Sequence, residues 1–297
     1  MAERAEHQRR VGIHLGTAGG VFKAAERAQQ IGANTFQIFS SSPRMWRASL
    51  PAPEVCARMK DLRLRHDLFP LVIHASYLVN VCSQTAAVLE NSVQALRGEV
   101  ERALALGAEY LVLHPGSWKG LTRQEGLRLA AESISRSLDG LPWMDSGLTI
   151  LIENTAGAEF SLGSSLDQVA ELIKRLEGCT RVAACLDTCH IHVSGYDIVS
   201  PEGYEDTVAQ IERVLGLETV RVWHSNDAKA ARGSRLDRHE HIGEGTIGIA
   251  PFRRLLNDAR FRHSAFIAET PVDDDDDDLR NLSVLRSLIA RSAAASV

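Results

Sequence analysis

Histidine and acidic residues follow a series of short apolar runs in this sequence. Six successive runs each end on one such residue: His74, His114, Glu153, Asp187, His224 and Glu269. Imidazole and carboxylate groups together suit zinc, and also manganese or iron. One histidine at such a place is usually a hydrogen-bonded core residue, but six successive ligand types predict a metal centre. Because one zinc needs three or four protein ligands, we expect at least two ions, an arrangement that hydrolyses phosphate esters.

A second group of candidate ligands lies in the same part of the chain. It consists of His190 in "DTCH" and of Asp237 and His239 in "DRH". In an extended Asp-x-His segment both side chains point to the same side. These three residues are enough for a third ion that keeps an open position.

Cations gather around these candidate ligands. They are Lys229, Arg232, Arg235 and Arg238, with Arg44 and Lys119 on other loops. A lone cation is usually a solvated surface charge, but a cluster beside a phosphate-hydrolysing metal site is expected to contact phosphates. Glycines 233, 243 and 245 are expected to let the backbone approach a substrate closely. Asp227 and His241 receive only a supporting hydrogen-bonding role.

Eight apolar or β-branched runs are expected to be strands. They cover 11–15, 35–39, 71–74, 110–114, 149–153, 182–187, 220–224 and 265–269. Helical spacing of apolar residues appears between them at 21–33, 91–108, 164–177, 202–215 and 278–291, with Gly32 and Gly107 placed as C-caps. Eight strand-then-helix units predict an α/β fold, a single-domain (β/α)8 TIM barrel, with an open doubly wound sheet as the alternative. In such a barrel the strand ends meet at one face, which brings the candidate ligands together.

Composition narrows the class of protein further. No apolar run has the length of a membrane span, and the polar start shows no secretory signal, so we expect a cytoplasmic protein. Residues 1–10 are expected to be a disordered tail before a domain at 11–293. The formal net charge of −5 includes six charges from Asp273–Asp278, a run expected to be a solvated loop before the last helix. The five scattered cysteines are expected to stay reduced.

Several motifs, in order along the chain, resemble those of a known family. They are "HASYL", "HPGS", "IENTAG", "LDTCH", "GYD", "HSNDAK", "GSRLDRHEHIGEGTIG" and "ETP". From about residue 11 to 290 the sequence is similar to endonuclease IV, the zinc-dependent abasic-site endonucleases of base-excision repair (AP endonuclease family 2). The resemblance implies a TIM barrel with three zinc ions, where manganese can replace zinc at some sites.

The resemblance also implies a role for each candidate ligand. His74 and His114 would hold the first zinc, and Glu153 would bridge the first and second. Asp187, His224 and Glu269 would complete the second, and His190, Asp237 and His239 would hold the third. The implied reaction is hydrolysis of the phosphodiester 5′ to an abasic site, giving a 3′-hydroxyl and a 5′-deoxyribose phosphate, with 3′-end cleaning as a further activity. Glu153 and Glu269 are the candidate catalytic residues, and Glu269 would orient or deprotonate the nucleophile.

The implied partner is double-stranded DNA with abasic sites, bound by a monomer that associates with the nucleoid. Arg44, Tyr77 and Leu78 match side chains that fill the gap left by the extruded sugar, although Tyr77 and Leu78 also suit a protein core. An abasic sugar has no base to unstack, so its extrusion costs less than that of an intact nucleotide. Two residues depart from the family pattern, Ala75 after the first ligand and Ser225 after the strand-end histidine. At Ala75 a hydrogen bond to a ligand is expected to be missing.

Two other functions remain open on the sequence. A metal-dependent sugar isomerase on a related barrel also places histidine and carboxylates at strand ends, but it needs one or two ions and no DNA groove. An abasic-DNA-binding protein without catalysis is the second alternative. The group formed by His190, Asp237 and His239 argues against the isomerase, and the complete ligand set argues against the non-catalytic protein.

Overall fold

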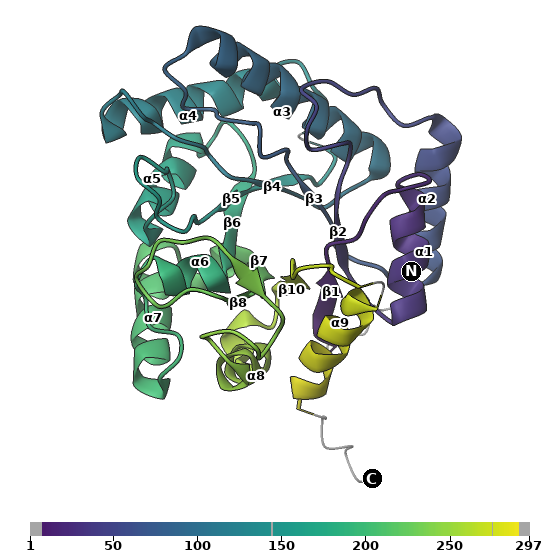
Figure 1. The fold of residues 1–297 in the computed structure, drawn as a ribbon. Coiled ribbons are helices and arrows are strands. Elements are labelled where there is room, and N and C mark those ends of the chain that lie inside the picture. Colours follow the sequence, from purple (N-terminus) through teal and green to yellow (C-terminus); the bar gives the residue numbers. More distant parts are fainter. Residues whose placement is uncertain (1–7, 144, 275, 291–297) are drawn as a thin grey trace.

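Eight parallel strands form a barrel at the centre of the computed structural model, which describes residues 8–143, 145–274 and 276–290 (Figure 1). The strands are β1 (Arg10–Ile13), β2 (Phe36–Phe39), β3 (Leu71–His74), β4 (Tyr110–Leu113), β5 (Thr149–Glu153), β6 (Val182–Asp187), β7 (Val220–His224) and β10 (Ala265–Ala268). Their order is β1-β10-β7-β6-β5-β4-β3-β2. The two ends of this order meet at a parallel bridge between His14 and Gln37, so the barrel is nearly closed. This confirms the TIM barrel and excludes the open doubly wound sheet.

Helices surround the barrel (Figure 1). They are α1 (Phe22–Ile31), α2 (Pro53–Arg65), α3 (Ala86–Leu106), α4 (Arg123–Leu138), α5 (Leu166–Leu176), α6 (Thr188–Val193), α7 (Pro201–Val214), α8 (Ile249–Asn257) and α9 (Asp277–Leu288), with 3-10 turns at Leu217–Thr219 and Ala259–Phe261. Gly32 and Gly107 end α1 and α3 with φ of 79° and 70°, which confirms both predicted caps. Helix α3 begins at Ala86 rather than at residue 91, because the helix-favouring "AAVLE" extends it toward its N-terminus.

The interior of the barrel explains why the candidate ligands share one end. A separate buried cluster fills this interior: Val72, Val112, Leu151, Ala183, Cys185, Val222, Ala265 and Ile267. Side chains two positions apart on a strand face the same side. Each of the six strand-end ligands lies two residues after a member of this cluster: His74, His114, Glu153, Asp187, His224 and Glu269. The same alternation that builds the core therefore points six ligands into the mouth of the barrel.

The long segment after β7 folds as a loop with a short hairpin. Its strands β8 (Asp227–Ala228) and β9 (His239–Glu240) pair antiparallel, and the pairing sets Ala228 opposite His239. The hairpin carries His239 back toward the barrel mouth.

The two ends of the chain and the five cysteines complete the fold. Residues 1–7 of the expected tail, and the expected domain end at 293, lie outside the described residues. Arg9 and Arg10 belong to the fold, because Arg9 donates to the carbonyl of Phe261 at 2.7 Å and Arg10 pairs with Asp67 at 2.7 Å. All five cysteines are free thiols, and four are buried. Within the described ranges, no helix combines the length and the apolar character needed to cross a membrane.

Candidate metal centre

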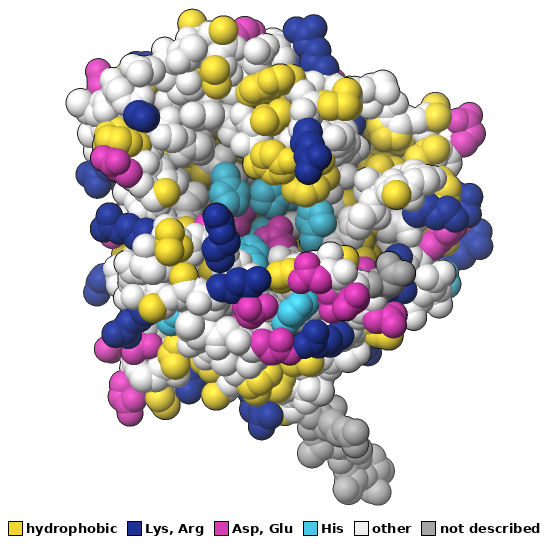
Figure 2. Space-filling view, viewed as in Figure 1, with side chains coloured by type: hydrophobic (Ala, Val, Ile, Leu, Met, Phe, Trp, Pro, Cys, Tyr) yellow, Lys and Arg dark blue, Asp and Glu magenta, His cyan; other side chains and the backbone are white. Residues whose placement is uncertain are grey.

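The predicted ligands converge at the mouth of the barrel. Figure 2 shows histidine side chains on the floor of a hollow in the middle of this face, with Lys and Arg side chains at its edge. The five ligand histidines follow one another as a chain of neighbouring rings. Centroid separations are 5.8 Å for His224–His74, 5.4 Å for His74–His114, 5.5 Å for His114–His190 and 5.8 Å for His190–His239. Residues from distant parts of the sequence thus line one site.

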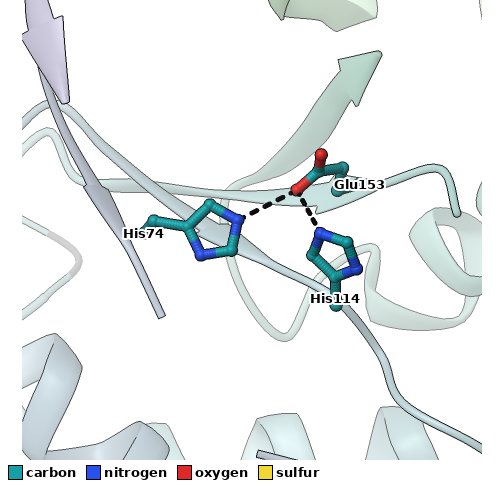
Figure 3. Close-up of side chains that lie close together, drawn as sticks. All are labelled: His74, His114 and Glu153. Atoms are coloured by element: carbon teal, nitrogen blue, oxygen red, sulfur yellow. Dashed lines mark hydrogen bonds and ion pairs between the residues drawn. The ribbon is translucent and has the colours of Figure 1, made fainter. Parts of the chain in front are cut away.

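Glu153, at the end of β5, lies at the centre of the first ligand group. Its Oε2 is 2.8 Å from His114 Nε2 and 3.2 Å from His74 Nε2 (Figure 3). The carboxylate is fully buried, and the three ligand atoms lie within 4.8 Å of one another. Two imidazole nitrogens and one carboxylate oxygen directed at a common point form a site that suits one divalent ion.

The other oxygen of Glu153 belongs to a second ligand group. Glu153 Oε1 lies 2.8 Å from His224 Nδ1, and the same nitrogen lies 3.2 Å from Glu269 Oε2. Asp187 joins these residues in a group of four whose ligand atoms also lie within 4.8 Å of one another. Because its two oxygens face different groups, Glu153 has the geometry of a bridging ligand.

The third group combines a helix with the β8–β9 hairpin. His190 lies on α6, and its Nε2 is 3.2 Å from Asp237 Oδ2, while His239 Nε2 is 3.4 Å from Asp237 Oδ1. Both nitrogens are buried, and neither has a partner with hydrogen-bond geometry among the residues that the structure describes. Buried polar atoms are almost always satisfied, so two unsatisfied imidazole nitrogens beside one carboxylate fit a metal ion.

Asp187 connects the second group to the third. Its Oδ2 lies 3.6 Å from His239 Nε2, and Asp187, His190 and His239 also form a possible ligand set. The sequence assigned Asp187 to the second ion alone. The structure places this residue between two ligand groups because α6 begins directly after it and turns His190 back over the end of β6.

The pKa values at the site follow from paired opposite charges. Burial acts to lower the pKa of His74, but the hydrogen bond to Glu153 together with the charges of Glu153 and Glu269 raises the pKa to about 9. Burial likewise opposes the charged form of His239, but Asp187 and Asp237 raise its pKa to about 9. Burial acts to raise the pKa of Glu153, while His114 and His224 hold it well below its usual range. The carboxylate of Glu153 is therefore ionised, as a metal ligand must be.

Two asparagines that the sequence analysis did not single out orient the ligands. Asn226 donates from Nδ2 to Asp187 Oδ2 at 2.6 Å, and its Oδ1 accepts the backbone N–H of Glu269 at 2.6 Å. Asn154 Oδ1 accepts the N–H of Asp187 at 2.7 Å, and its carbonyl is 2.8 Å from His190 Nδ1. Their position directly beside ligands, in "IENTAG" and "HSND", was the available signal. Such partners fix ligand orientation and tautomer.

Ala75 departs from the family pattern, but the ligand before it, His74, still has a hydrogen-bond partner. The backbone carbonyl of Ala75 lies 2.7 Å from His74 Nδ1. A backbone acceptor therefore leaves His74 Nε2 free for metal. The Ser225 hydroxyl, at the other departure, is buried without a hydrogen-bond partner, and the structure gives no reason for a serine there.

Asp227 has a clear structural role. Its buried carboxylate accepts backbone N–H groups from Gly243 at 2.9 Å, Gly245 at 3.1 Å and Ile247 at 2.9 Å. A Cβ on Gly245 would lie 2.4 Å from the carbonyl oxygen of Ala228. The backbone N–H groups of Gly243 and Gly245 therefore bind Asp227, and a side chain at Gly245 would not fit there.

The predicted DNA contacts on the loops after β2, β3 and β4 lie at or near the surface. Arg44 and Lys119 are exposed, Tyr77 is 60 % exposed, and Leu78 is half-buried. Tyr77 is therefore not a core residue. It meets Phe39 edge to face with centroids 6.3 Å apart, and Phe39 meets His74 at 5.6 Å, which places Tyr77 beside the first ligand group.

The cations of the long loop differ in their contacts. Lys229 lies 3.8 Å from Glu240, and Arg238 donates to the carbonyl of Asp237 at 2.7 Å. Arg232 forms an ion pair with Asp197 at 2.7 Å. Arg235 lines a polar cavity of about 260 Å³ with Trp118 and Phe160, and its φ of 59° is unusual for a residue other than glycine. All four side chains are exposed, and two of them face a carboxylate, Arg232 at 2.7 Å and Lys229 at 3.8 Å.

The aspartate run, apart from Asp275, is tied to the fold more closely than a solvated loop. Asp277 begins α9, and its Oδ2 accepts the backbone N–H groups of Asp273 and Asp274, both at 2.9 Å. Asp278 pairs with Arg27 at 3.7 Å. The expected position before the last helix is confirmed, but two of the aspartates are buried or paired because they shape the turn into that helix.

A barrel with strand-end histidines and carboxylates defines a class of metal-binding TIM-barrel enzymes. The family model described as "Xylose isomerase-like TIM barrel" matches residues 25–288. The chain is 47% identical over 281 residues to "Probable endonuclease 4" of Solibacter usitatus, covering 94% of this chain and 96% of that protein. It is 39% identical to "Probable endonuclease 4" of Chloroflexus aurantiacus, covering 94% and 98%.

The solved structures agree with these relatives. The crystal structure of endonuclease IV from Thermus thermophilus matches with a TM-score of 0.82 and 36% identity, over 94% of this chain and 98% of that one. The chain belongs to the endonuclease IV family. The resemblance read from the motifs is thereby confirmed.

Proposed function

We propose that this protein hydrolyses the phosphodiester 5′ to abasic sites in double-stranded DNA, leaving a 3′-hydroxyl and a 5′-deoxyribose phosphate, and that it also cleans 3′ ends. The observation that carries the proposal is the presence of three adjacent ligand groups at one barrel mouth, in a chain of the endonuclease IV family. We further propose that it acts as a monomer, in the cytoplasm and at the nucleoid.

The ligand assignment supports three zinc ions, with manganese able to replace zinc at some positions. His74 and His114 would hold the first ion, Glu153 would be shared by the first and second, and Asp187, His224 and Glu269 would complete the second. His190, Asp237 and His239 would hold the third. Bound at these positions, the ions would activate a water at neutral pH and offset negative charge on the leaving oxygen.

We propose that Glu269 orients the attacking water as a hydrogen-bond acceptor and does not act as the general base that removes its proton. Burial acts to raise the pKa of Glu269, but the charge of His224 and the nearby imidazoles of His14 and His74 lower it far below the usual range. A carboxylate with so low a pKa is a weak base. It remains a good hydrogen-bond acceptor, and its place beside Glu153 and His224 suits that role.

The surface around the centre supports DNA as the substrate. Exposed Tyr77 and half-buried Leu78 lie beside His74 and are proposed, with Arg44, to fill the gap left by the extruded abasic sugar. Lys119, Lys229, Arg235 and Arg238 are proposed to contact phosphates. Arg232 is proposed to contribute less, because Asp197 already compensates its charge.

A sugar isomerase on a related barrel is the second candidate function. The family description names such an enzyme, and the first two ligand groups suit its chemistry. The two buried and unsatisfied imidazole nitrogens beside Asp237 favour the nuclease, because a third ion has a use in phosphodiester cleavage and none in isomerisation.

A duplex with a single tetrahydrofuran abasic analogue tests the proposal, because this analogue cannot undergo β-elimination. Metal analysis and cleavage are measured on the same preparation, with and without chelation. Metal-dependent incision 5′ to the analogue is expected. An intact strand in the presence of three bound ions would contradict the nuclease and favour simple binding.

The Asp237→Ala variant tests the separate role of the third group. We expect lower occupancy of the third ion and a lower kcat, with duplex binding largely retained. The exposed Asp206→Asn variant on α7 is the control. Cleavage by Asp237→Ala at the normal rate would show that the third ion does not stabilise the leaving oxygen.

A further inference from the structure

Gln37 is a fully buried polar residue on β2 that touches the second ligand group. Its Oε1 lies 2.8 Å from His224 Nε2. Its Nε2 lies 2.5 Å from Glu269 Oε1 and 3.0 Å from His14 Nδ1. Every hydrogen-bonding position of the side-chain amide except one carbonyl lone pair is therefore used. A fully buried amide with so many of its hydrogen-bonding positions occupied is held in one orientation.

The orientation of the amide is determined by its neighbours. The Glu269 carboxylate only accepts hydrogen bonds, so the Gln37 atom facing it is the NH2 group. The carbonyl oxygen then faces His224 Nε2 and accepts its proton. A flipped amide would place oxygen against a carboxylate and NH2 against an N–H, and both contacts would be repulsive.

This contact fixes the tautomer of His224. With a proton held on Nε2 by Gln37, Nδ1 is the nitrogen left to bind a metal, and it lies 2.8 Å from Glu153 and 3.2 Å from Glu269. The other four ligand histidines present Nε2 to the carboxylates: His74, His114, His190 and His239. His224 is thus the exception among the five, and Gln37 explains it.

The Gln37 amide also gives the two carboxylate oxygens of Glu269 different surroundings. Gln37 Nε2 donates to Oε1, while Oε2 faces His224 Nδ1. The second proton of the NH2 group is accepted by His14 Nδ1, which holds the amide from the end of β1. One side chain therefore determines which nitrogen of His224 and which oxygen of Glu269 face the second metal position.

We propose that Gln37 is a positioning residue, which presents His224 as an Nδ1 ligand and Glu269 as a ligand through Oε2. The inference rests on the proposed second metal position, because both residues belong to that group. Partners of this kind typically change metal affinity or activity about 10–100-fold when they are removed. Polar partners usually orient histidine ligands from a carboxylate or a backbone carbonyl, and here a side-chain amide orients two ligands of different type.

Two variants test the carbonyl oxygen and the NH2 group of the Gln37 amide separately. Gln37→Met keeps the length of the side chain and loses both the carbonyl oxygen and the NH2 group. Gln37→Glu keeps an oxygen for His224 Nε2–H but loses the donors to Glu269 and His14. The matched control is Gln94→Met on the exposed face of α3, and circular dichroism checks that each variant is folded.

Metal affinity is the first measurement. The zinc-loaded proteins are titrated with a chelator, and the ions retained are counted. In both Gln37 variants we expect one of three ions to be lost at about 10–100-fold lower chelator concentration than in the wild type and in Gln94→Met. Retention within about twofold of the wild type in either folded variant would overturn the proposal, since removal of an orienting partner costs more than that. The metal content and cleavage of the wild type test the proposed function separately, so the two failures are distinguishable.

The tautomer is the second measurement, and it does not depend on activity. Two-dimensional NMR of 15N-histidine-labelled zinc protein distinguishes metal-bound Nδ1 from metal-bound Nε2. We expect one Nδ1-bound ring in the wild type and in Gln37→Glu, and loss of this pattern in Gln37→Met. A wild-type spectrum with only Nε2-bound rings, or an unchanged Gln37→Met spectrum, would refute the assignment. If Gln37→Met does not fold, Gln37→Glu carries the test through its metal affinity.

Discussion

Replacing Asp227 by asparagine is expected to loosen the loop that carries the third ligand group. The Asp227 carboxylate is fully buried and accepts N–H groups from residues that lie far along the loop. Oδ1 accepts from Ile247 at 2.9 Å, and Oδ2 accepts from Gly243 at 2.9 Å and Gly245 at 3.1 Å. Asparagine keeps the shape of the side chain but offers one oxygen instead of two. An NH2 group must then face backbone donors at one of these positions.

The expected cost follows from the number of donors that lose an acceptor. Besides these contacts, Oδ1 accepts from Ala228, and the N–H of Gly248 lies near both oxygens. At least two backbone N–H groups are left without an acceptor, whichever oxygen is replaced. A buried unsatisfied donor costs about 1–3 kcal/mol, so we expect Asp227→Asn to lower the free energy of unfolding by about 2–5 kcal/mol.

The assay is urea unfolding of chelator-treated protein, which removes the contribution of bound metal. The control is Asp206→Asn, an exposed aspartate on α7, for which a change below about 0.5 kcal/mol is expected. Metal counting then tests the link to the site. β8, which contains Asp227, pairs with β9, which contains His239, so the third ion should be bound more weakly than the other two.

Two results would refute this reasoning about Asp227. A free energy of unfolding within about 0.5 kcal/mol of the wild type would show that the backbone donors find other partners at little cost. A destabilised variant that keeps all three ions with unchanged affinity would show that the hairpin holds His239 without Asp227.

Three further predictions concern the surface of the site and its pH dependence. Tyr77→Ala should weaken binding to an abasic duplex, measured by fluorescence anisotropy, with an unchanged Tm, because Tyr77 is 60 % exposed. Arg235→Ala should lower the salt dependence of duplex binding by about one phosphate contact. Arg232→Ala should lower it less, because Arg232 is paired with Asp197. Equal effects of the two substitutions would contradict the proposed difference. Burial acts to raise the pKa of Asp197, but the N–H groups of Ser200 and Val199 and the charge of Arg232 lower it to about 2, below its ordinary 3.8. The partly exposed carboxylate therefore stabilises the fold above about pH 4 and loses this effect as the pH falls toward about 2. Asp197→Asn should lower the free energy of unfolding by about 1–2 kcal/mol at about pH 6 and by clearly less at about pH 3. Urea unfolding of chelator-treated protein at the two pH values measures this difference.

The barrel and its six strand-end ligands could be predicted because one rule produces both. A buried parallel strand alternates side chains between the barrel interior and the helix layer, and the pattern continues for one more step at the strand end. Thus Val72 predicts the direction of His74, and Leu151 that of Glu153. The rule needs only local sequence and the assumption of a closed barrel.

Residues that act through tertiary contacts could not be predicted in this way. Gln37 lies inside an apolar strand, and its partners His224 and Glu269 are 187 and 232 positions away. Asp227 is close to a ligand in sequence, but its backbone partners depend on the path of the loop. The regular spacing of an alternating strand carries no information about either contact. The lone polar residue in "TFQIF" was a usable signal, since a buried amide inside an apolar strand needs a polar partner.

Charge compensation at the barrel mouth links folding to metal binding. Glu153 and Asp187 are fully buried anions, which is costly unless cations lie beside them. Raised pKa values, such as those of His74 and His239, allow protonated imidazoles to supply that charge. Metal ions bind neutral imidazole, so they must displace these protons and take over the same role. Metal binding would therefore replace one set of cations beside these carboxylates with another.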